Sequence, residues 1–178
     1  TIQKQIKQIE NLVNEFSDFA RMPKPLLKKN NLYEVINENV NLLNKIDPNI
    51  KIKLINHLNK DSIVNFDYEQ FTRLFFNLIK NSIESIQEKA QKDSKIDKNI
   101  DIEIRGRRDY IIVNLFDTGI GFKNKNTKDL IKPYFTTKHK GTGLGLSIVD
   151  KIISDHNGSI NFTNQNNGAK IQIIIPNK

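Results

Sequence analysis

The sequence predicts an α+β fold, a two-layer α/β sandwich in which helices cover one face of a mixed sheet, with an amphipathic helix at its N-terminus. Segments with helical spacing of apolar residues alternate along the chain with pairs of strand-like segments, and this order places helices and strands in separate layers. The 178 residues, 37% of them hydrophobic, suffice for one domain with its own core and a short appendage.

The first helix is predicted over residues 1–22, where apolar residues recur every three or four positions from Ile2 to Ala20. This spacing is typical of a coiled-coil or bundle seam. Pro23 and Pro25 end the helix, because proline lacks a backbone N–H and disfavours helical geometry in the preceding residue. An isolated apolar stripe needs a partner surface, so we expect the chain to begin inside a longer protein that supplies one.

The next elements are a helix and two strands. A helix is predicted over residues 30–46, and the Asp-Pro-Asn turn at 47–49 ends it. Two short segments rich in β-branched residues, 51–55 and 62–66, then predict strands separated by a polar turn.

The most strongly predicted helix begins after Asp67. Gln70 follows three positions later in a capping-box arrangement, and helical periodicity continues from Tyr68 to about Lys89. Apolar residues take up roughly 200° of the helix circumference. We therefore expect most of this helix to be buried.

The remainder of the chain alternates the same two kinds of element. Gly158 ends the last helix, and an Asn-Asn-Gly turn joins the last two strands into a hairpin. In order, these elements are a charged loop at 93–99, strands at 100–105 and 110–116, a basic segment at 122–140 with at most one short helix, a helix at 144–156, and strands at 159–163 and 170–175.

Composition narrows the function classes. The 28 Lys+Arg against 20 Asp+Glu give a net charge of +8, which favours a polyanionic partner. A basic nucleic-acid-binding module is one such class, although no helix-turn-helix, RNA-binding aromatic motif or basic stripe accompanies the charge. The absence of cysteine excludes disulfides, thiolate zinc sites and cysteine nucleophiles. No apolar run approaches the roughly 18 residues needed to cross a bilayer.

Two asparagines on the long helix form the first candidate site. Asn77 and Asn81 are four residues apart, so they stack on one face in the narrow arc that apolar residues leave free. Their amide oxygens are suited to a hard cation such as Mg²⁺. The alternative is that two asparagines at a helix edge simply face solvent.

Two further motifs follow strand and loop segments. Asp117 ends a predicted strand and is followed by Gly119 and Gly121; a carboxylate accepts a hydrogen bond from an amine such as adenine N6, and glycines let the backbone approach a ring. Taken alone, this pattern also fits an ordinary turn. Residues 133–138 place an aromatic pair before two threonines and a lysine, which alone fits any loop held down by aromatic packing.

The fourth motif is the glycine-rich segment GTGLGL at 141–146, which opens a helix. Backbone N–H groups at a helix N-terminus favour a phosphate. The segment is not a Walker A loop, because no Gly-Lys-Ser/Thr ends it, and a Rossmann fingerprint would need a preceding strand and different spacing.

In this order, the four motifs resemble the N, G1, F and G2 boxes of the sensor histidine kinase catalytic domain, which belongs to the Bergerat-fold (GHKL) ATPases. The resemblance covers about residues 30–176. The segment NLIKNSIESI at 77–86 is similar to nitrogen-regulation sensor kinases, and EFSDFARMPKP at 15–25 looks like the end of the second helix of their dimerisation and phosphotransfer hairpin. The expected organisation is a partial hairpin helix at 1–22, a linker at 23–29 and an ATP-binding catalytic domain at 30–178.

The resemblance implies that ATP and Mg²⁺ are bound. Asn81 would coordinate Mg²⁺ with support from Asn77. Asp117 would bind the adenine amine, and Gly119 and Gly121 would shape the base pocket.

On the phosphate side, the resemblance implies that residues 122–140 form a mobile lid over ATP. Phe135 would anchor this lid, and Thr137 and Lys138 would lie near the phosphates. The wall behind the phosphates would consist of Gly141, Thr142, Gly143, Leu144, Gly145 and Leu146.

Asn77 bears on the reaction class. Where the related gyrase and MutL ATPases carry a water-activating glutamate, this chain has an amide that cannot accept a proton at neutral pH. We therefore expect transfer of the γ-phosphate to a protein side chain. A water-activating Bergerat ATPase is the alternative.

The phosphate acceptor in the family is a histidine on the first hairpin helix. His57, His139 and His156 lack that sequence context, and each is predicted to lie at the surface. The resemblance thus implies that the acceptor, and with it any catalytic histidine, is not in this chain, which would be unable to autophosphorylate alone. It also implies a two-component phosphorelay in the cytoplasm, with a phosphotransfer hairpin and a response regulator receiver domain as partners, a homodimeric parent protein and no nucleic acid.

Overall fold

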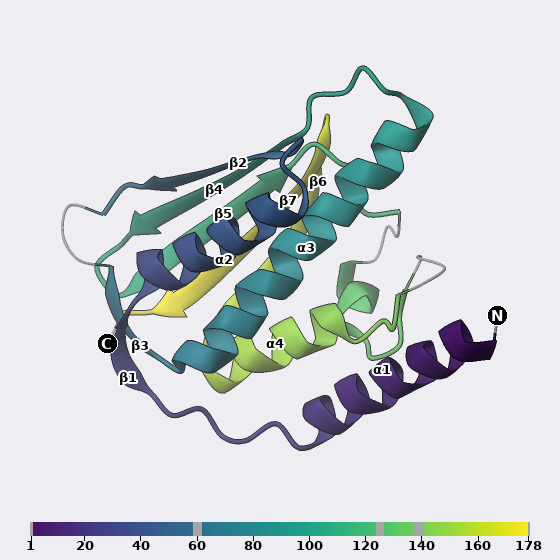
Figure 1. The fold of residues 1–178 in the computed structure, drawn as a ribbon. Coiled ribbons are helices and arrows are strands. Elements are labelled where there is room, and N and C mark those ends of the chain that lie inside the picture. Colours follow the sequence, from purple (N-terminus) through teal and green to yellow (C-terminus); the bar gives the residue numbers. More distant parts are fainter. Residues whose placement is uncertain (1, 59–61, 124–126, 137–140, 178) are drawn as a thin grey trace.

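The computed structural model describes residues 2–58, 62–123, 127–136 and 141–177. A five-stranded sheet forms one layer, and helices α2, α3 and α4 cover one of its faces (Figure 1). The predicted two-layer α+β fold is confirmed. Its helical elements are α1 (Ile2–Ala20), α2 (Leu32–Ile46), α3 (Tyr68–Lys92), the 3₁₀ helix η1 (Thr127–Ile131) and α4 (Gly145–Asp155).

The sheet is mixed, as predicted. Its strand order is β2-β4-β5-β7-β6, with β2 and β4 parallel and the other neighbours antiparallel. Alternate residues of the central strands, such as Ile100, Ile102 and Ile104, are buried against the helices, as the two-residue period of a strand requires. The strands are β1 (Lys28–Asn31), β2 (Lys51–Asn56), β3 (Ile63–Phe66), β4 (Asn99–Gly106), β5 (Tyr110–Asp117), β6 (Ser159–Gln165) and β7 (Gly168–Pro176).

One strand was not predicted. β1 occupies positions assigned to the linker and to the start of the following helix, and it pairs antiparallel with β3 in a separate two-stranded sheet. Its sequence, Lys-Lys-Asn-Asn, has no apolar alternation. The α2 helix consequently starts later than predicted, at Leu32, with Asn31 as the N-cap whose side chain accepts from the Tyr33 N–H at 3.0 Å.

Asp67 caps α3 at its N-terminus, since its Oδ1 accepts from the Gln70 N–H at 3.1 Å. The other half of the predicted capping box is absent. The Gln70 side chain instead donates to the Pro23 carbonyl at 3.0 Å, and Asp67 Oδ2 accepts from the Leu26 N–H at 2.8 Å. The N-terminus of α3 thus holds the segment that follows α1. The helix is largely buried, as predicted, and runs three residues beyond Lys89.

The α1 helix lies outside the sandwich, along the side where α4 begins (Figure 1). Glu15 accepts a hydrogen bond from the Thr142 hydroxyl, and the Phe16 ring stacks on Tyr134 with the centroids 6.3 Å apart. Apolar side chains elsewhere on α1 remain exposed, among them Ile2, Ile6, Ile9 and Val13. No helix in the described residues has the length and apolar character that a membrane span requires.

The predicted surface location of His156 is wrong, because its side chain is only 5% exposed. Its Nε2 accepts from the Asp67 N–H at 3.0 Å, and its Nδ1 lies 2.7 Å from the Ile152 carbonyl. Since a carbonyl only accepts, Nδ1 carries the proton and the ring is neutral. The ring also packs edge-on against Phe71. His57 is exposed, as predicted, and His139 lies outside the described residues.

This buried ring predicts a pH-dependent stability. Burial lowers the pKa of His156, against opposing effects of the Ile152 carbonyl and of the Asp67 and Asp155 carboxylates. Below about pH 6.5 the unfolded chain takes up a proton that the folded chain does not. The free energy of unfolding should therefore be highest above that pH and fall on acidification, by at most about 1.4 kcal/mol per pH unit for one proton.

Urea unfolding measured between about pH 7.5 and pH 5, above the range where most carboxylates titrate, tests this expectation. His156→Gln should lower the free energy of unfolding at neutral pH and make it less dependent on pH. The control His57→Gln, at an exposed position, should keep the pH dependence of the unmodified chain. An unchanged pH dependence in His156→Gln would show that this ring does not cause the acid sensitivity.

Candidate functional site

Asp117 ends β5 and lies beneath α3 with only 6% of its surface exposed. Its Oδ1 accepts from the Gly119 N–H at 2.9 Å and its Oδ2 from the Ser82 hydroxyl at 3.1 Å. Burial raises the pKa of this carboxyl, although hydrogen bonds from Gly119, Ser82 and Ala169 and the charge of Lys89 oppose the shift. Each carboxylate oxygen has a second lone pair, so Asp117 retains capacity to accept from a ligand amine.

The turn after Asp117 is held against α3. The Ile120 N–H donates to Ser85 Oγ at 3.1 Å. A Cβ on Gly119 would lie 2.1 Å from that same oxygen, so only glycine fits this approach. Gly121 has φ of +71°, a backbone conformation that favours glycine. Both glycines of the predicted motif are therefore required by the geometry of the turn.

Asn77 and Asn81 project from α3 toward the beginning of α4. A Cβ on Gly145 would lie 3.2 Å from Asn77 Oδ1 and 3.8 Å from Asn81 Nδ2. Asn77 Nδ2 donates to the Arg73 carbonyl at 2.9 Å, which leaves its Oδ1 directed toward Gly145. The two predicted residues thus meet the glycine-rich segment, and both are partly rather than fully exposed.

The glycine-rich segment ends in α4, whose N-cap residue Leu144 is fully buried and makes no side-chain capping bond. The first N–H groups of a helix without such a cap need other partners, and an anion can supply them. Gly143 has φ of +72° and packs against the Tyr134 backbone, where a Cβ would come within 2.5 Å. Of the other predicted residues, Gly141 is exposed, while Thr142 and Leu146 are partly buried.

Phe135 is partly buried and packs against the core. The segment before it contains η1, the single short helix that the sequence allowed. Thr137 and Lys138, the other two residues predicted in this segment, lie outside the described residues.

The sequence model of the family described as histidine kinase-, DNA gyrase B-, and HSP90-like ATPase matches residues 66–178. The chain belongs to this family. It is 31% identical to the nitrogen regulation protein NtrY of Azorhizobium caulinodans over 177 residues, which cover 98% of the chain and 23% of the relative. It is 32% identical to the putative sensor histidine kinase NtrY-like of Rickettsia felis over 166 residues, 93% of the chain and 26% of that relative. The chain thus spans about a quarter of these curated relatives.

Solved structures agree with this assignment. The catalytic domain of histidine kinase ThkA superimposes with a TM-score of 0.73 at 29% identity, covering 85% of this chain and 95% of that one. The structure of ThkA in complex with response regulator protein TrrA shares the fold, with a TM-score of 0.78 at 24% identity, and the match covers 99% of this chain and 49% of ThkA. The chain is therefore a sensor histidine kinase catalytic domain with the Bergerat ATP-binding fold.

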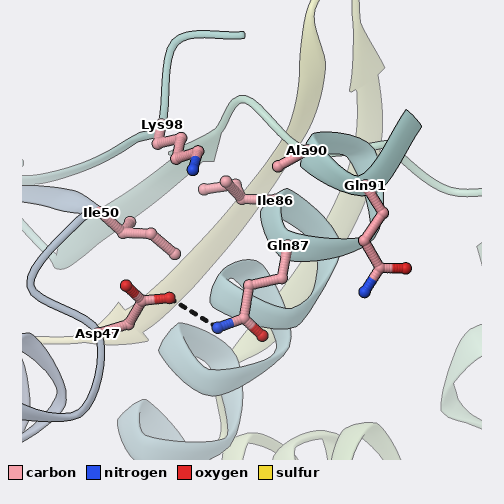
Figure 2. A pocket seen from close by; sticks show the side chains of 7 residues that line it. All are labelled: Asp47, Ile50, Ile86, Gln87, Ala90, Gln91 and Lys98. Carbon is pink, nitrogen blue, oxygen red and sulfur yellow. Dashed lines mark hydrogen bonds between the residues drawn. The ribbon is translucent and has the colours of Figure 1, made fainter. Parts of the chain in front are cut away.

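One cavity of this kinase domain lies between the β6–β7 hairpin and the ends of β4 and β5, and another lies beside α3. The first, of about 390 Å³, lies beside Asp117 and is also lined by Thr118, Asn164 and Ala169. The other, of about 330 Å³, lies near Ile86 (Figure 2). Ile86 is nine residues beyond Asn77, which places it on the opposite side of the helix. The second cavity is therefore separate from the candidate site.

The second cavity lies between α3 and the segments that directly precede β2 and β4. Gln87 donates to Asp47 at 2.6 Å across its edge (Figure 2). This bond is the main reason why the pKa of Asp47 is lowered. The full lining is Asp47, Ile50, Ile86, Gln87, Ala90, Gln91 and Lys98.

Three residues near the site were not predicted. Ser82 and Ser85 bind the Asp117 carboxylate and the turn after it, and Asn164 binds the backbone beyond Gly121. Ser82 lies on the buried face of α3. A polar residue within an otherwise apolar helix face was the available signal, since a buried hydroxyl requires a partner.

Proposed function

We propose that this chain is the ATP- and Mg²⁺-binding catalytic domain of a two-component kinase that transfers the γ-phosphate of ATP to a histidine on a phosphotransfer helix outside the chain. The observation that carries the proposal is the buried Asp117 carboxylate at the end of β5, held next to a glycine turn. The uncapped N-terminus of α4, facing two asparagine amides, supports it.

The base and phosphates of ATP would occupy different ends of this site. Asp117 would accept a hydrogen bond from the adenine amine, and Gly119 and Gly121 would let the backbone approach the ring. The segment 141–146 and the first N–H groups of α4 would bind the phosphates. Thr137 and Lys138 are proposed to act on the phosphate side as well, and Phe135 to anchor the segment that carries them.

Mg²⁺ would be held by Asn81 and Asn77 together with phosphate oxygens. Within the described residues no group of three His, Cys, Asp or Glu side chains could hold a metal ion. An amide-and-phosphate set suits Mg²⁺, which takes oxygen ligands and is commonly held by few protein groups plus substrate phosphates. The engagement of Asn77 Nδ2 by Arg73 fits this role, because it leaves the oxygen for the ion or its waters.

The reaction we propose is phosphoryl transfer rather than hydrolysis. Asn77 occupies the position where a carboxylate base would activate water, and its amide cannot accept the proton. A histidine nitrogen would form a bond to the γ-phosphorus, and the bond from that phosphorus to the β–γ bridging oxygen would break, releasing ADP. The protein's part in such a step is positioning and charge neutralisation.

The acceptor histidine would come from another helix. Both nitrogens of His156 are engaged in a buried site, and His57 lies beyond the end of β2, away from α4. We propose that α1 is the second helix of a dimerisation and phosphotransfer hairpin, for which its exposed apolar residues would provide the packing surface. A response regulator receiver domain would then take the phosphate in the cytoplasm.

Calorimetric titration with a non-hydrolysable ATP analogue tests the proposal. Saturable binding is expected, and it should tighten when Mg²⁺ is added. No saturable binding by the folded chain would refute it.

A second measurement separates transfer from hydrolysis. With ATP, the chain alone should neither label itself nor release phosphate steadily, while an added phosphotransfer hairpin should become labelled on histidine. Steady phosphate release that disappears in Asn77→Ala would instead identify a water-activating ATPase.

A further inference from the structure

Asn164 on β6 binds both backbone groups of Phe122, a residue 42 positions earlier in the chain. Its Oδ1 accepts from the Phe122 N–H at 2.7 Å, and its Nδ2 donates to the Phe122 carbonyl at 3.0 Å. One side chain thus satisfies a peptide donor and a peptide acceptor at once, as a neighbouring strand would.

The bound residue directly follows the glycine turn of the site. Gly121 approaches so closely that a Cβ there would lie 2.7 Å from Asn164 Oδ1 and 3.1 Å from the Gly168 carbonyl. The Phe122 ring packs edge-on against Phe162, which precedes Asn164 by two positions and so lies on the same face of β6. The end of the turn is therefore fixed by hydrogen bonds, close packing and a ring contact.

A second bond connects the same hairpin to the start of the turn. Lys89 on α3 donates to the Thr118 carbonyl at 3.0 Å and also to Asn167 Oδ1. The β6–β7 hairpin therefore braces the turn after Asp117 at two points, through Lys89 near its start and through Asn164 at its end. Asn167 of the hairpin reaches the turn only through Lys89, whereas Asn164 binds the backbone of the turn directly.

The side chain at position 164 must accept from the Phe122 N–H and donate to the Phe122 carbonyl, which requires an amide of this length. Aspartate offers acceptors without a donor, serine is shorter, and alanine has no polar group. The bonds form at an exposed site on the hairpin rather than in the core. Loss of them should therefore change the turn much more than the global fold.

We propose that Asn164 is a positioning residue for adenine nucleotides. It holds the backbone at Phe122 so that Gly119 and Gly121 keep the conformation that forms the base side of the site beside Asp117. This role rests on the proposed function and extends it to a residue that acts through the backbone of the turn. Because the effect acts on the base side, it should apply equally to ATP and ADP.

The test uses Asn164→Ala, Asn164→Asp and the control Thr163→Ala, whose side chain is exposed and points to the other face of β6. Asn164→Ala should weaken the binding of ATP and ADP analogues about tenfold each, since two hydrogen bonds are lost. It should also speed amide hydrogen exchange at Phe122 while leaving the melting temperature nearly unchanged.

Asn164→Asp keeps the bond to the Phe122 N–H and should give protection and affinity between those of the unmodified chain and Asn164→Ala. Thr163→Ala should match the unmodified chain in all three measurements. Equal affinities in all four proteins, or unchanged exchange at Phe122 in Asn164→Ala, would overturn the role of Asn164 alone. Absence of nucleotide binding by the unmodified chain would overturn the proposed function itself.

Discussion

Replacing Asp117 by asparagine is expected to weaken the binding of ATP analogues by about 100-fold or more. Both carboxylate oxygens already accept hydrogen bonds, from Gly119 and from Ser82. In Asp117→Asn one acceptor becomes an NH₂ donor. The Ser82 hydroxyl can rotate to accept from this donor, so the adenine amine is the group that is left facing a donor. Loss of a charge-assisted hydrogen bond together with an unsatisfied buried group costs about 3 kcal/mol, which corresponds to roughly 100-fold in affinity.

The variant should fold normally. A carboxyl whose pKa is raised by burial carries a free-energy cost for its charge in the folded state at neutral pH, and a neutral amide relieves that cost. Calorimetric titration and a thermal melt of the same sample therefore separate binding from folding. Asp109→Asn is the matched control, because it makes the same change on an exposed residue just before β5 begins. Unchanged affinity in Asp117→Asn would contradict base recognition by this carboxylate.

The parts of the fold that the sequence predicted are those with a local signal. The apolar arc of α3 and the alternation in β4 and β5 arise within single segments, and each element formed near its predicted limits. β1 has no such signal. Its Lys-Lys-Asn-Asn backbone pairs with β3, more than thirty residues away along the chain, through main-chain groups that every residue carries. The hydropathy pattern of a segment therefore does not predict such pairing.

The same distinction applies to the site. Helical geometry alone places Asn77 and Asn81 on one face, so their juxtaposition was predictable, whereas the approach of Gly145 depends on how α4 packs on α3. His156 had the local features of an exposed helix C-terminus, and its burial depends on a bond to Asp67, 89 residues earlier. Asn164 lies on β6 just before an Asn-rich turn, and its hydrogen bonds to the backbone form only when the fold brings Phe122 beside it.

A methyl group added at Gly168 should strongly lower the free energy of unfolding. This residue begins β7 with φ of +116°, a conformation that side chains other than glycine rarely adopt. An added Cβ would lie 1.8 Å from the Asp117 carbonyl oxygen and 2.9 Å from Thr118 Cα, both backbone atoms that no side-chain rotation can move away. Either β7 must separate from β5 at the Asp117–Ala169 pair, or the end of β5 must shift.

Gly168→Ala is therefore expected to lower the free energy of unfolding by about 3–5 kcal/mol, because strain at positive φ adds to a backbone collision. Urea denaturation at neutral pH measures this change. Gly106→Ala is the matched control: it is the same substitution on β4, but its Cβ would meet only the end of the flexible Leu58 side chain, at 2.5 Å. It should cost about 1 kcal/mol or less. If the two variants were equally stable, the hairpin turn would not approach Asp117 as described, and the bracing of the nucleotide site by β6 and β7 would lose its basis.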